Sequence, residues 1–224
     1  EREKGRTIRE QIHSIQLRML RILDTICKKY DIDYWLDYGT LLGAIRHQGF
    51  IPWDYDIDIG MLRSDYNLFI EKGVKDLPFD IFFQNRDTDP NLKEVSYIVE
   101  AHLRDRFSNC VELQRDWNGS ITWHNGLYLD FFVYDYDSEN DWLSNGFERI
   151  LNQSKIYFKL NEIEYLDTAI FEGNEYPIPV GYDSYLKRCY GEYLELPPIK
   201  EQERLSDVDV FNPCDHPTSL NWKD

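Results

Sequence analysis

The chain has 224 residues, a hydrophobic content of 42%, an aromatic content of 15% and a formal net charge of −16. This composition supports a packed hydrophobic core, so we expect a folded chain and not a disordered one. The acidic balance argues against a nucleic-acid-binding protein, which needs a basic face, and against adhesion to an anionic membrane by charge alone.

Neither a transmembrane segment nor a signal peptide is predicted from the sequence. We therefore expect a cytoplasmic protein that can act peripherally at the inner face of the cell membrane. The four cysteines are widely spaced and form no CxxC pair, so we expect reduced thiols and no zinc cluster.

Over the first 61 residues of the chain, the pattern predicts two helices and two strands. Apolar residues recur every three or four positions from Thr7 to Tyr30, which predicts an amphipathic helix. We expect a short strand over Asp33 to Tyr38 and a short helix over Thr40 to His47, with Thr40 as the N-cap. A second strand is predicted from Asp54 to Met61.

In the second half, Leu127 to Tyr134 is strongly β-prone and predicts a strand. We expect a helix over Asp141 to Leu160, a hairpin over Ala169 to Pro179 and a helix over Asp183 to Tyr190. No repeat or linker divides the chain. We therefore expect one α+β domain over residues 1–224, whose core would be the strands that bear Asp56, Asp58 and Asp130.

Three aspartates, Asp54, Asp56 and Asp58, alternate with apolar residues. Side chains two apart on a strand share a face, so Asp56 and Asp58 are expected to project together. Two adjacent carboxylates repel each other, and a hard divalent cation such as Mg²⁺ (or Mn²⁺) relieves that repulsion. A solvated acidic turn is one alternative. A calcium loop is another, but Ile59 and Asp65 stand where that loop needs Gly and Glu.

Gly39 and Thr40 lie where the first predicted strand meets the short helix. Backbone N–H groups at a helix N-terminus bind phosphate, and glycine permits close approach, although a glycine needed only for the turn is the alternative. A phosphate cradle beside two carboxylates is typical of phosphoryl or nucleotidyl transfer. Arg46 and His47 end the helix, where they can meet a diphosphate or simply complement the helix dipole.

The run GTLLGAIRHQGFIPWDYDIDIG, from Gly39 to Gly60, closely resembles the signature of the LicD family. That family includes bacterial phosphocholine transferases and the fukutin-related ribitol-phosphate transferases. Leu127 to Tyr134 and Pro179 to Pro198 are similar to later segments of the family, so the resemblance extends from about Ile12 to Pro198.

The resemblance implies a nucleotidyltransferase-like fold, which is a mixed sheet flanked by helices, with a core over residues 12–198. It also implies a divalent metal held by Asp56 and Asp58. It implies that Asp130 is a third carboxylate, which completes the metal site or acts as general base. From the residues alone, Asp130 stands between large apolar neighbours and is either buried with a partner or lines a site. Asp54 is expected to orient the pair. A further strand is predicted from Ser96 to Arg106, and on it His102 alternates with Arg104. His102 can face the same cleft, or be a satisfied buried histidine.

The activity implied by the resemblance is a Mg²⁺-dependent transfer of a phospho-alcohol, with phosphocholine the first choice. The donor would be CDP-choline or another CDP-alcohol, the acceptor a hydroxyl of a cell-surface glycan precursor such as teichoic acid or lipopolysaccharide, and CMP would be released. The scattered cysteines depart from the zinc element of the animal members, which favours the bacterial branch. Two alternatives stay open: a nucleotidyltransferase that moves NMP from an NTP, and a non-catalytic acidic binding module.

Overall fold

The computed structural model describes residues 5–89, 99–110, 126–151, 155–202 and 208–209. The α-helices are α1 (Ile8–Tyr30), α2 (Tyr38–His47), α3 (Arg63–Leu68), α4 (Gly146–Leu151) and α5 (Tyr182–Tyr190). Single turns of other helix types occur at η1 (Phe69–Gly73), η2 (Val74–Asp76), η5 (Leu160–Glu162) and η6 (Ile199–Glu201). The strands are β1 (Trp35–Leu36), β2 (Asp58–Leu62), β3 (Ile81–Gln84), β4 (Ala101–Asp105), β5 (Asn109–Cys110), β6 (Tyr128–Asp137), β7 (Trp142–Ser144), β8 (Tyr157–Lys159), β9 (Leu166–Phe171), β10 (Asn174–Pro179) and β11 (Val208–Asp209).

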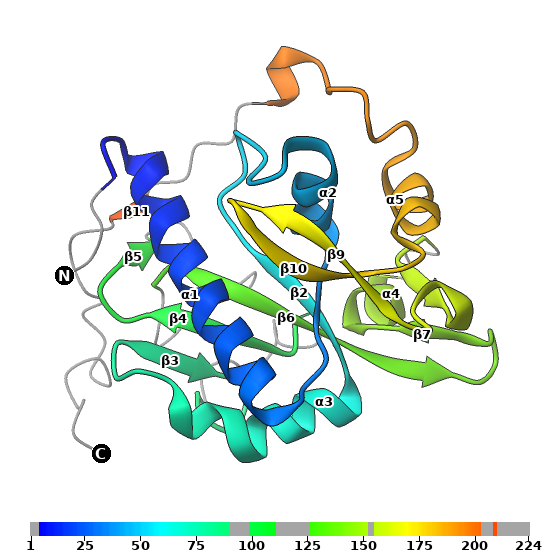
Figure 1. Ribbon diagram of the computed structural model, residues 1–224, viewed down its shortest axis with the longest axis horizontal. Coiled ribbons are helices and arrows are strands. Elements are labelled where there is room, and N and C mark those ends of the chain that lie inside the picture. Colours follow the sequence, from blue (N-terminus) through cyan, green and yellow to red (C-terminus); the bar gives the residue numbers. More distant parts are fainter. Residues whose placement is uncertain (1–4, 90–98, 111–125, 152–154, 203–207, 210–224) are drawn as a thin grey trace.

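A mixed sheet with the strand order β1-β2-β6-β4-β3 forms the centre of the fold, and β7 and β8 extend it beyond β6 (Figure 1). β2 and β6 run parallel, whereas β1–β2, β4–β6 and β3–β4 are antiparallel. The β9–β10 hairpin and the β5–β11 pair form two smaller sheets. This arrangement confirms the expected α+β class with a mixed sheet flanked by helices.

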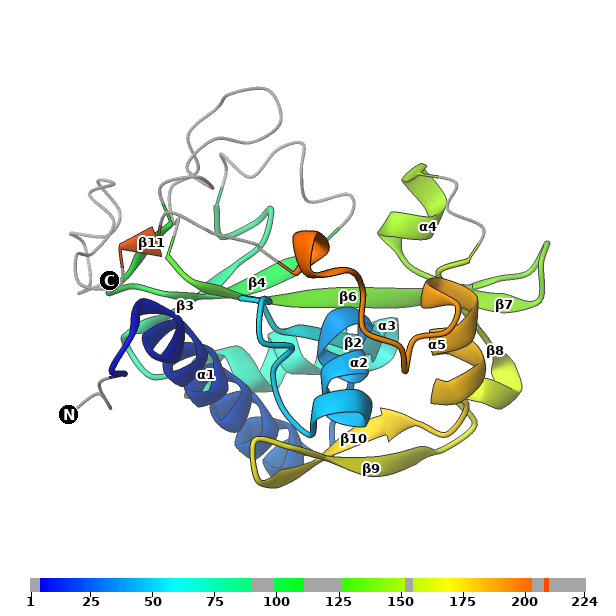
Figure 2. The same cartoon turned by 90° about the horizontal axis from the view of Figure 1, so that it is seen from above.

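The helices divide between the two faces of the sheet (Figure 2). α1, α2, α5 and the β9–β10 hairpin lie on one side, and α4 lies on the other. The apolar stripe of α1 is buried from Ile12 to Ile26 and packs against β4 and β6. Aromatic rings fill the space between the sheet and this layer; those with almost no exposed surface include Trp35, Phe69, Phe131, Tyr134, Phe158 and Tyr185.

Several predicted elements are confirmed. The first helix begins at Ile8, where Thr7 is the N-cap in a capping box with Glu10. Leu127 to Tyr134 corresponds to β6, the predicted hairpin corresponds to β9 and β10, and the helix predicted from Asp183 corresponds to α5. α5 stops at Gly191, whose φ of 68° lies in the left-handed region that glycine adopts easily.

The prediction of a helix over Asp141 to Leu160 is wrong. The segment contains two antiparallel strands, β7 and β8, on either side of the short helix α4. Trp142 and Tyr157 lie diagonally across this strand pair and stack, with 3.9 Å between their ring centroids. Such cross-strand aromatic contacts are absent from an isolated segment, which explains why the local pattern favoured the wrong structure.

The start of the second helix is also corrected. The first strand is limited to Trp35–Leu36, and α2 begins at Tyr38 with Asp37, not Thr40, as its N-cap. The Asp37 carboxylate is fully buried and accepts hydrogen bonds from Tyr38 N (2.8 Å), Tyr134 Oη (2.7 Å) and Tyr185 Oη (2.9 Å). Asp37 therefore joins α2 to β6 and α5. Burial raises the pKa of Asp37 to about 6, although the hydrogen bonds from Tyr134, Tyr38 and Tyr185 act in the opposite direction.

We expect Asp37→Ala to lower the free energy of unfolding by about 3 kcal/mol, because it removes the N-cap and leaves two buried tyrosine hydroxyls unpaired. Urea unfolding followed by circular dichroism measures this loss. Asp37→Asn is the matched control, since its amide oxygen still accepts hydrogen bonds and it should retain most of the stability. An equal loss of stability in both variants would contradict a role for the hydrogen bonds that Asp37 accepts, and would indicate that its charge itself is required.

Candidate active site

The carboxylates predicted from the sequence lie on and beside two adjacent strands. Asp58 is the first residue of β2 and is directly opposite Asp130 of β6 in the parallel register. Asp58 and Asp130 are both buried, with 8% of each residue exposed. Asp56 precedes the strand, because β2 begins at Asp58 and not at Asp54 as predicted. Asp56 and Asp58 nevertheless line the same cleft, while Ile57 between them is fully buried, so the predicted alternation holds.

The start of α2 holds Asp58 through its backbone. Asp37 N donates to Asp58 O over 3.0 Å, and Asp58 N donates to Thr40 Oγ1 over 2.9 Å. Both peptide groups that flank the Asp58 side chain are therefore bonded to the first turn of α2. The buried Thr40 hydroxyl accepts from Asp58 N and so joins the first turn of α2 to β2. The N-cap of α2 is Asp37 and not Thr40.

Gly39 lies where no larger residue fits without displacing an acid. A Cβ added at Gly39 would be 2.8 Å from Asp54 Oδ2 and 3.8 Å from Asp58 Oδ2. Two carboxylate groups therefore face the first turn of α2, whose N–H groups lack intrahelical acceptors. Tyr38, the residue before it, has a φ of 41°, which is strained for an aromatic residue. The glycine at position 39 is thus explained by the close approach of the two carboxylate groups.

Electrostatic repulsion is strong at Asp58. Burial raises the pKa of the Asp58 carboxyl well above its ordinary value, and the nearby carboxylates of Asp56, Asp130 and Asp54 raise it further. None of the salt bridges formed among the described residues includes Asp58. A buried acid in this environment favours either a proton or a bound cation.

Asp130 has a close partner in His102, which faces it from β4. The two residues are paired in the antiparallel register, and His102 Nδ1 lies 2.5 Å from Asp130 Oδ1. Burial lowers the pKa of His102, and Arg104 lowers it too, while Asp130 opposes the shift. The neutral imidazole therefore donates its Nδ1–H to the carboxylate, which orients Asp130. The plainer interpretation of His102, a buried and hydrogen-bonded histidine, is correct, and its partner is a candidate site residue.

A cleft of about 880 Å³ opens beside these acids. One wall comes from α2 and the 51–58 segment, and the opposite wall comes from residues 190–198 after α5. Its lining is aromatic and acidic; it includes Tyr38, Trp53, Asp54, Asp56, Asp58, Phe147, Tyr190, Glu192, Tyr193 and Glu195. A cleft of this volume is in the range of small-molecule and nucleotide sites.

Arg46 and His47 lie at the other end of α2. Arg46 lines the cleft, but its Nη1 donates to Tyr193 O (2.9 Å) and Glu195 O (3.2 Å) and so holds residues 190–198 against α2. The His47 ring packs edge-on against Trp53, and burial together with Arg46 lowers its pKa. Contact of either residue with a phosphate stays a prediction.

Whether this donor set fits a metal follows from its chemistry. Among the described residues, no group of three or more His, Cys, Asp or Glu side chains forms a ready metal site. Mg²⁺ commonly uses only one or two carboxylates and takes its other ligands from water and substrate phosphates. The buried carboxylate of Asp58 and the half-buried carboxylate of Asp56, which repels it, lie at an open cleft and suit that mode of binding.

Sequence reasoning missed three features of the site. Asp37 was included in a predicted strand, although an aspartate just before a helix is a favoured N-cap. The contributions of α1 and of residues 190–198 were not predicted, because such contacts join segments far apart in the chain.

No described helix is both long and apolar enough to span a bilayer.

Aspartates paired across parallel strands below a helix N-terminus define a class of site typical of phosphoryl- and nucleotidyl-transferring enzymes. A family model described as "LicD/FKTN/FKRP, nucleotidyltransferase domain" matches residues 31–180. The chain therefore belongs to the LicD/FKTN/FKRP family, as the signature run from Gly39 to Gly60 indicated.

Three relatives show how the similarity is distributed. The lipopolysaccharide cholinephosphotransferase LicD of Haemophilus influenzae is 25% identical over 270 residues, which cover 89% of this chain and 96% of that protein. The mouse ribitol-5-phosphate transferase FKTN is 22% identical over 182 residues, covering 80% of this chain and 33% of its own length. The human ribitol 5-phosphate transferase FKRP is 56% identical over 34 residues, covering 15% of this chain and 7% of its own.

We expect Thr40→Val to lower the free energy of unfolding by about 1–2 kcal/mol, because the buried Asp58 N–H loses its acceptor. Thr40→Ser keeps the hydroxyl and is the matched control. Chemical denaturation of the three proteins measures the difference. If the valine variant is as stable as the serine variant, the Thr40 hydroxyl does not hold Asp58.

The raised pKa of Asp58 predicts a pH-dependent effect on stability. The stabilisation from a group whose pKa is higher in the folded state is complete below its unfolded pKa and is lost as the pH rises through its folded pKa. In a chelating buffer at pH 8, the uncharged Asp58→Asn should therefore exceed the wild type in free energy of unfolding by about 1 kcal/mol or more. The gap should shrink as the pH falls toward 4. Unfolding curves across this range measure it, and a gap independent of pH would contradict the burial of a repelled charge.

Proposed function

We propose that this protein transfers a phospho-alcohol, with phosphocholine the first choice, from a CDP-linked donor to a hydroxyl of a cell-surface glycan precursor, with release of CMP. The observation that carries the proposal is the burial of Asp58 directly opposite Asp130, together with the exposure of Asp56 and Asp58 to one open cleft. Membership of a family whose relatives include a cholinephosphotransferase and two ribitol phosphate transferases supports the reaction class.

In this proposal Asp56 and Asp58 hold a Mg²⁺ ion, which when bound neutralises charge on the donor diphosphate and on the departing CMP. Manganese can serve in the same coordination. The N–H groups around Gly39 and Thr40, which lack intrahelical acceptors in the first turn of α2, bind a phosphate oxygen. Because the backbone of Asp58 is held on both sides by α2, the phosphate and the carboxylates keep one relative position.

Asp130 is the proposed general base. The Nδ1–H of His102 occupies Asp130 Oδ1, which leaves Oδ2 to accept the proton of the acceptor hydroxyl. The hydroxyl oxygen forms a bond to the phosphorus nearest the transferred alcohol while the bond from that phosphorus to the bridging oxygen of the diphosphate breaks. CMP leaves with the electron pair of that bond.

The lining of the cleft favours a donor with a cationic head group. Tyr38, Trp53, Tyr190 and Tyr193 present aromatic rings, and Glu192 and Glu195 add negative charge on the same wall as Tyr193. Quaternary ammonium groups are bound by aromatic faces in this way. Within the described part of the lining, the cationic side chain is that of Arg46, which already donates to two carbonyl groups.

Donor binding provides the first test. CDP-choline, CDP-ribitol and CDP-glycerol should each be titrated calorimetrically with and without Mg²⁺. We expect CDP-choline to bind most tightly, and binding to weaken at least about tenfold in chelator, because the diphosphate loses its metal bridge. Equal binding with and without Mg²⁺ would exclude metal bridging, and tighter binding of CDP-ribitol would change the assigned alcohol.

Turnover with teichoic acid or lipopolysaccharide precursors separates the remaining alternatives. Release of CMP from a CDP-alcohol supports the proposal, whereas release of pyrophosphate from an NTP supports a nucleotidyltransferase. Asp58→Asn should reduce turnover about 10²-fold or more while the fold survives. The matched control is Asp167→Asn, an exposed aspartate of β9. Unchanged turnover in Asp58→Asn would contradict the proposed role of Asp58, and a wild type that turns over neither a CDP-alcohol nor an NTP would support the non-catalytic binding module.

A further inference from the structure

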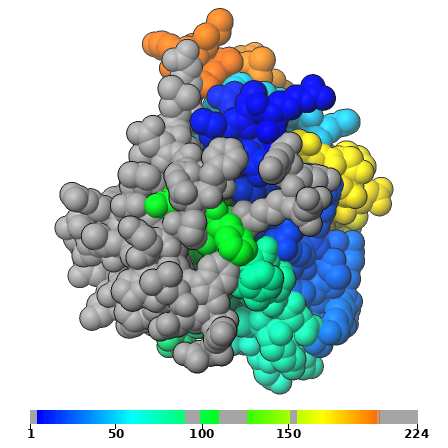
Figure 3. Space-filling view, turned by 90° about the vertical axis from the view of Figure 1, so that its left-hand side faces the viewer, coloured from blue at the N-terminus to red at the C-terminus, as the bar shows by residue number. Residues whose placement is uncertain are grey.

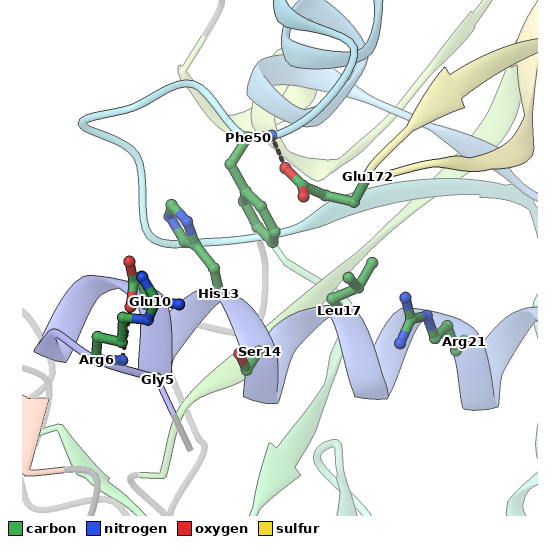
Figure 4. Close-up of a pocket in the computed structure, with 9 residues that line it drawn as sticks. All are labelled: Gly5, Arg6, Glu10, His13, Ser14, Leu17, Arg21, Phe50 and Glu172. Carbon is green, nitrogen blue, oxygen red and sulfur yellow. Dashed lines mark hydrogen bonds between the residues drawn. The ribbon is translucent and has the colours of Figure 1, made fainter. Parts of the chain in front are cut away.

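Residues 48–57, called the acid loop here, lead from α2 to Asp58 and contain Asp54 and Asp56. Side chains from outside this loop hold it in place. At its start, Glu172 in the turn of the β9–β10 hairpin accepts a hydrogen bond from Phe50 N over 3.1 Å (Figure 4). At its end, Asp58 N is held by Thr40. The middle of the loop is held by α1.

His13 is the first of two α1 residues that reach the loop. Its ring lies parallel to Phe50, with centroids 4.0 Å apart and an interplanar angle of 3° (Figure 4). Its Nε2 lies 2.9 Å from Asp54 O, and because a carbonyl oxygen only accepts, Nε2 carries the proton and donates. Figure 3 shows the start of α1 at the surface between the yellow hairpin and the orange C-terminal segment.

Gln16 follows His13 by one helical turn and is fully buried. Its Nε2 donates both hydrogens, one to Tyr55 O and one to Tyr128 O, the latter over 3.1 Å. Tyr55 precedes Asp56, and Tyr128 lies two residues before Asp130. Asp130 N donates to Ile57 O over 2.8 Å and so joins β6 to the acid loop directly. The carbonyl groups of Tyr55 and Tyr128 are both acceptors and cannot bond to each other, so Gln16 joins them by donating to both.

The burial of Gln16 lowers stability, and this energetic cost indicates a role for its side chain beyond packing. The Oε1 of Gln16 is buried and has no hydrogen-bond partner among the described residues. A buried unpaired acceptor lowers stability, so an apolar residue would serve packing alone better. A glutamine at this position is explained if its two N–H groups fix the distance between the acid loop and β6.

We propose that His13 and Gln16 are positioning residues of the active site, and that α1 holds the acid loop in register with β6. α1 lies outside residues 31–180, which the family model matches. The consequence for catalysis rests on the proposed function, but the positioning itself does not. A displacement of about 1 Å in such a site can reduce the rate about 10²-fold.

Amide hydrogen exchange, read by mass spectrometry on peptides that cover residues 51–59, tests the proposal without any ligand. Gln16→Leu removes both donors, and His13→Phe keeps the stacking on Phe50 but loses the bond to Asp54 O. We expect exchange in these peptides to rise about tenfold or more in both variants, because the loop opens locally. Turnover should fall by a similar factor, with donor affinity less affected.

Gln11→Leu is the matched control, since Gln11 is also a buried glutamine of α1 but its Oε1 accepts from Gly5 N. Unchanged exchange in His13→Phe and Gln16→Leu, or an equal rise in Gln11→Leu, would overturn the proposal. If Gln16→Leu does not fold, His13→Phe decides the result alone. If the wild type transfers no phospho-alcohol, the proposed function fails, while the exchange data still decide whether α1 positions the loop.

Discussion

The constraint on which the rest of the structure depends is the burial of the Asp58 carboxylate beside other carboxylates that repel it. Burial and the neighbouring carboxylates disfavour its charged form, yet its backbone is bonded on both sides by the first turn of α2. Asp37 anchors that turn through two tyrosine hydroxyls from β6 and α5. Stability gained in the core thus offsets an unfavourable arrangement at the site, which is the usual relation between a fold and a strained active centre.

The site is completed by segments that are distant in the chain. α1 supplies His13 and Gln16 to the acid loop, and the hairpin turn supplies Glu172. Residues 190–198 close the cleft and are held by Arg46. The family model matches residues 31–180 and so ends before this last segment.

Sequence identity to the relatives is higher in a short stretch than over the whole chain. A stretch of 34 residues is 56% identical to human FKRP, whereas the whole-chain match to the Haemophilus LicD is 25% identical.

From the sequence alone, the predicted elements gave the α+β class and strand periodicity predicted that Asp56 and Asp58 project together, whereas the family and the third carboxylate, Asp130, were indicated by the resemblance to the LicD signature. Sequence reasoning failed where the decisive contacts are not local. The strands β7 and β8 are stabilised by pairing with each other, and the periodicity of a single segment carries no information about such pairing, so a helix was predicted there. Only the tertiary structure decided that Asp37 braces α2, that His102 orients Asp130, and that α1 reaches the acid loop. Each of these interactions is a hydrogen bond between segments whose proximity arises only when the core has formed.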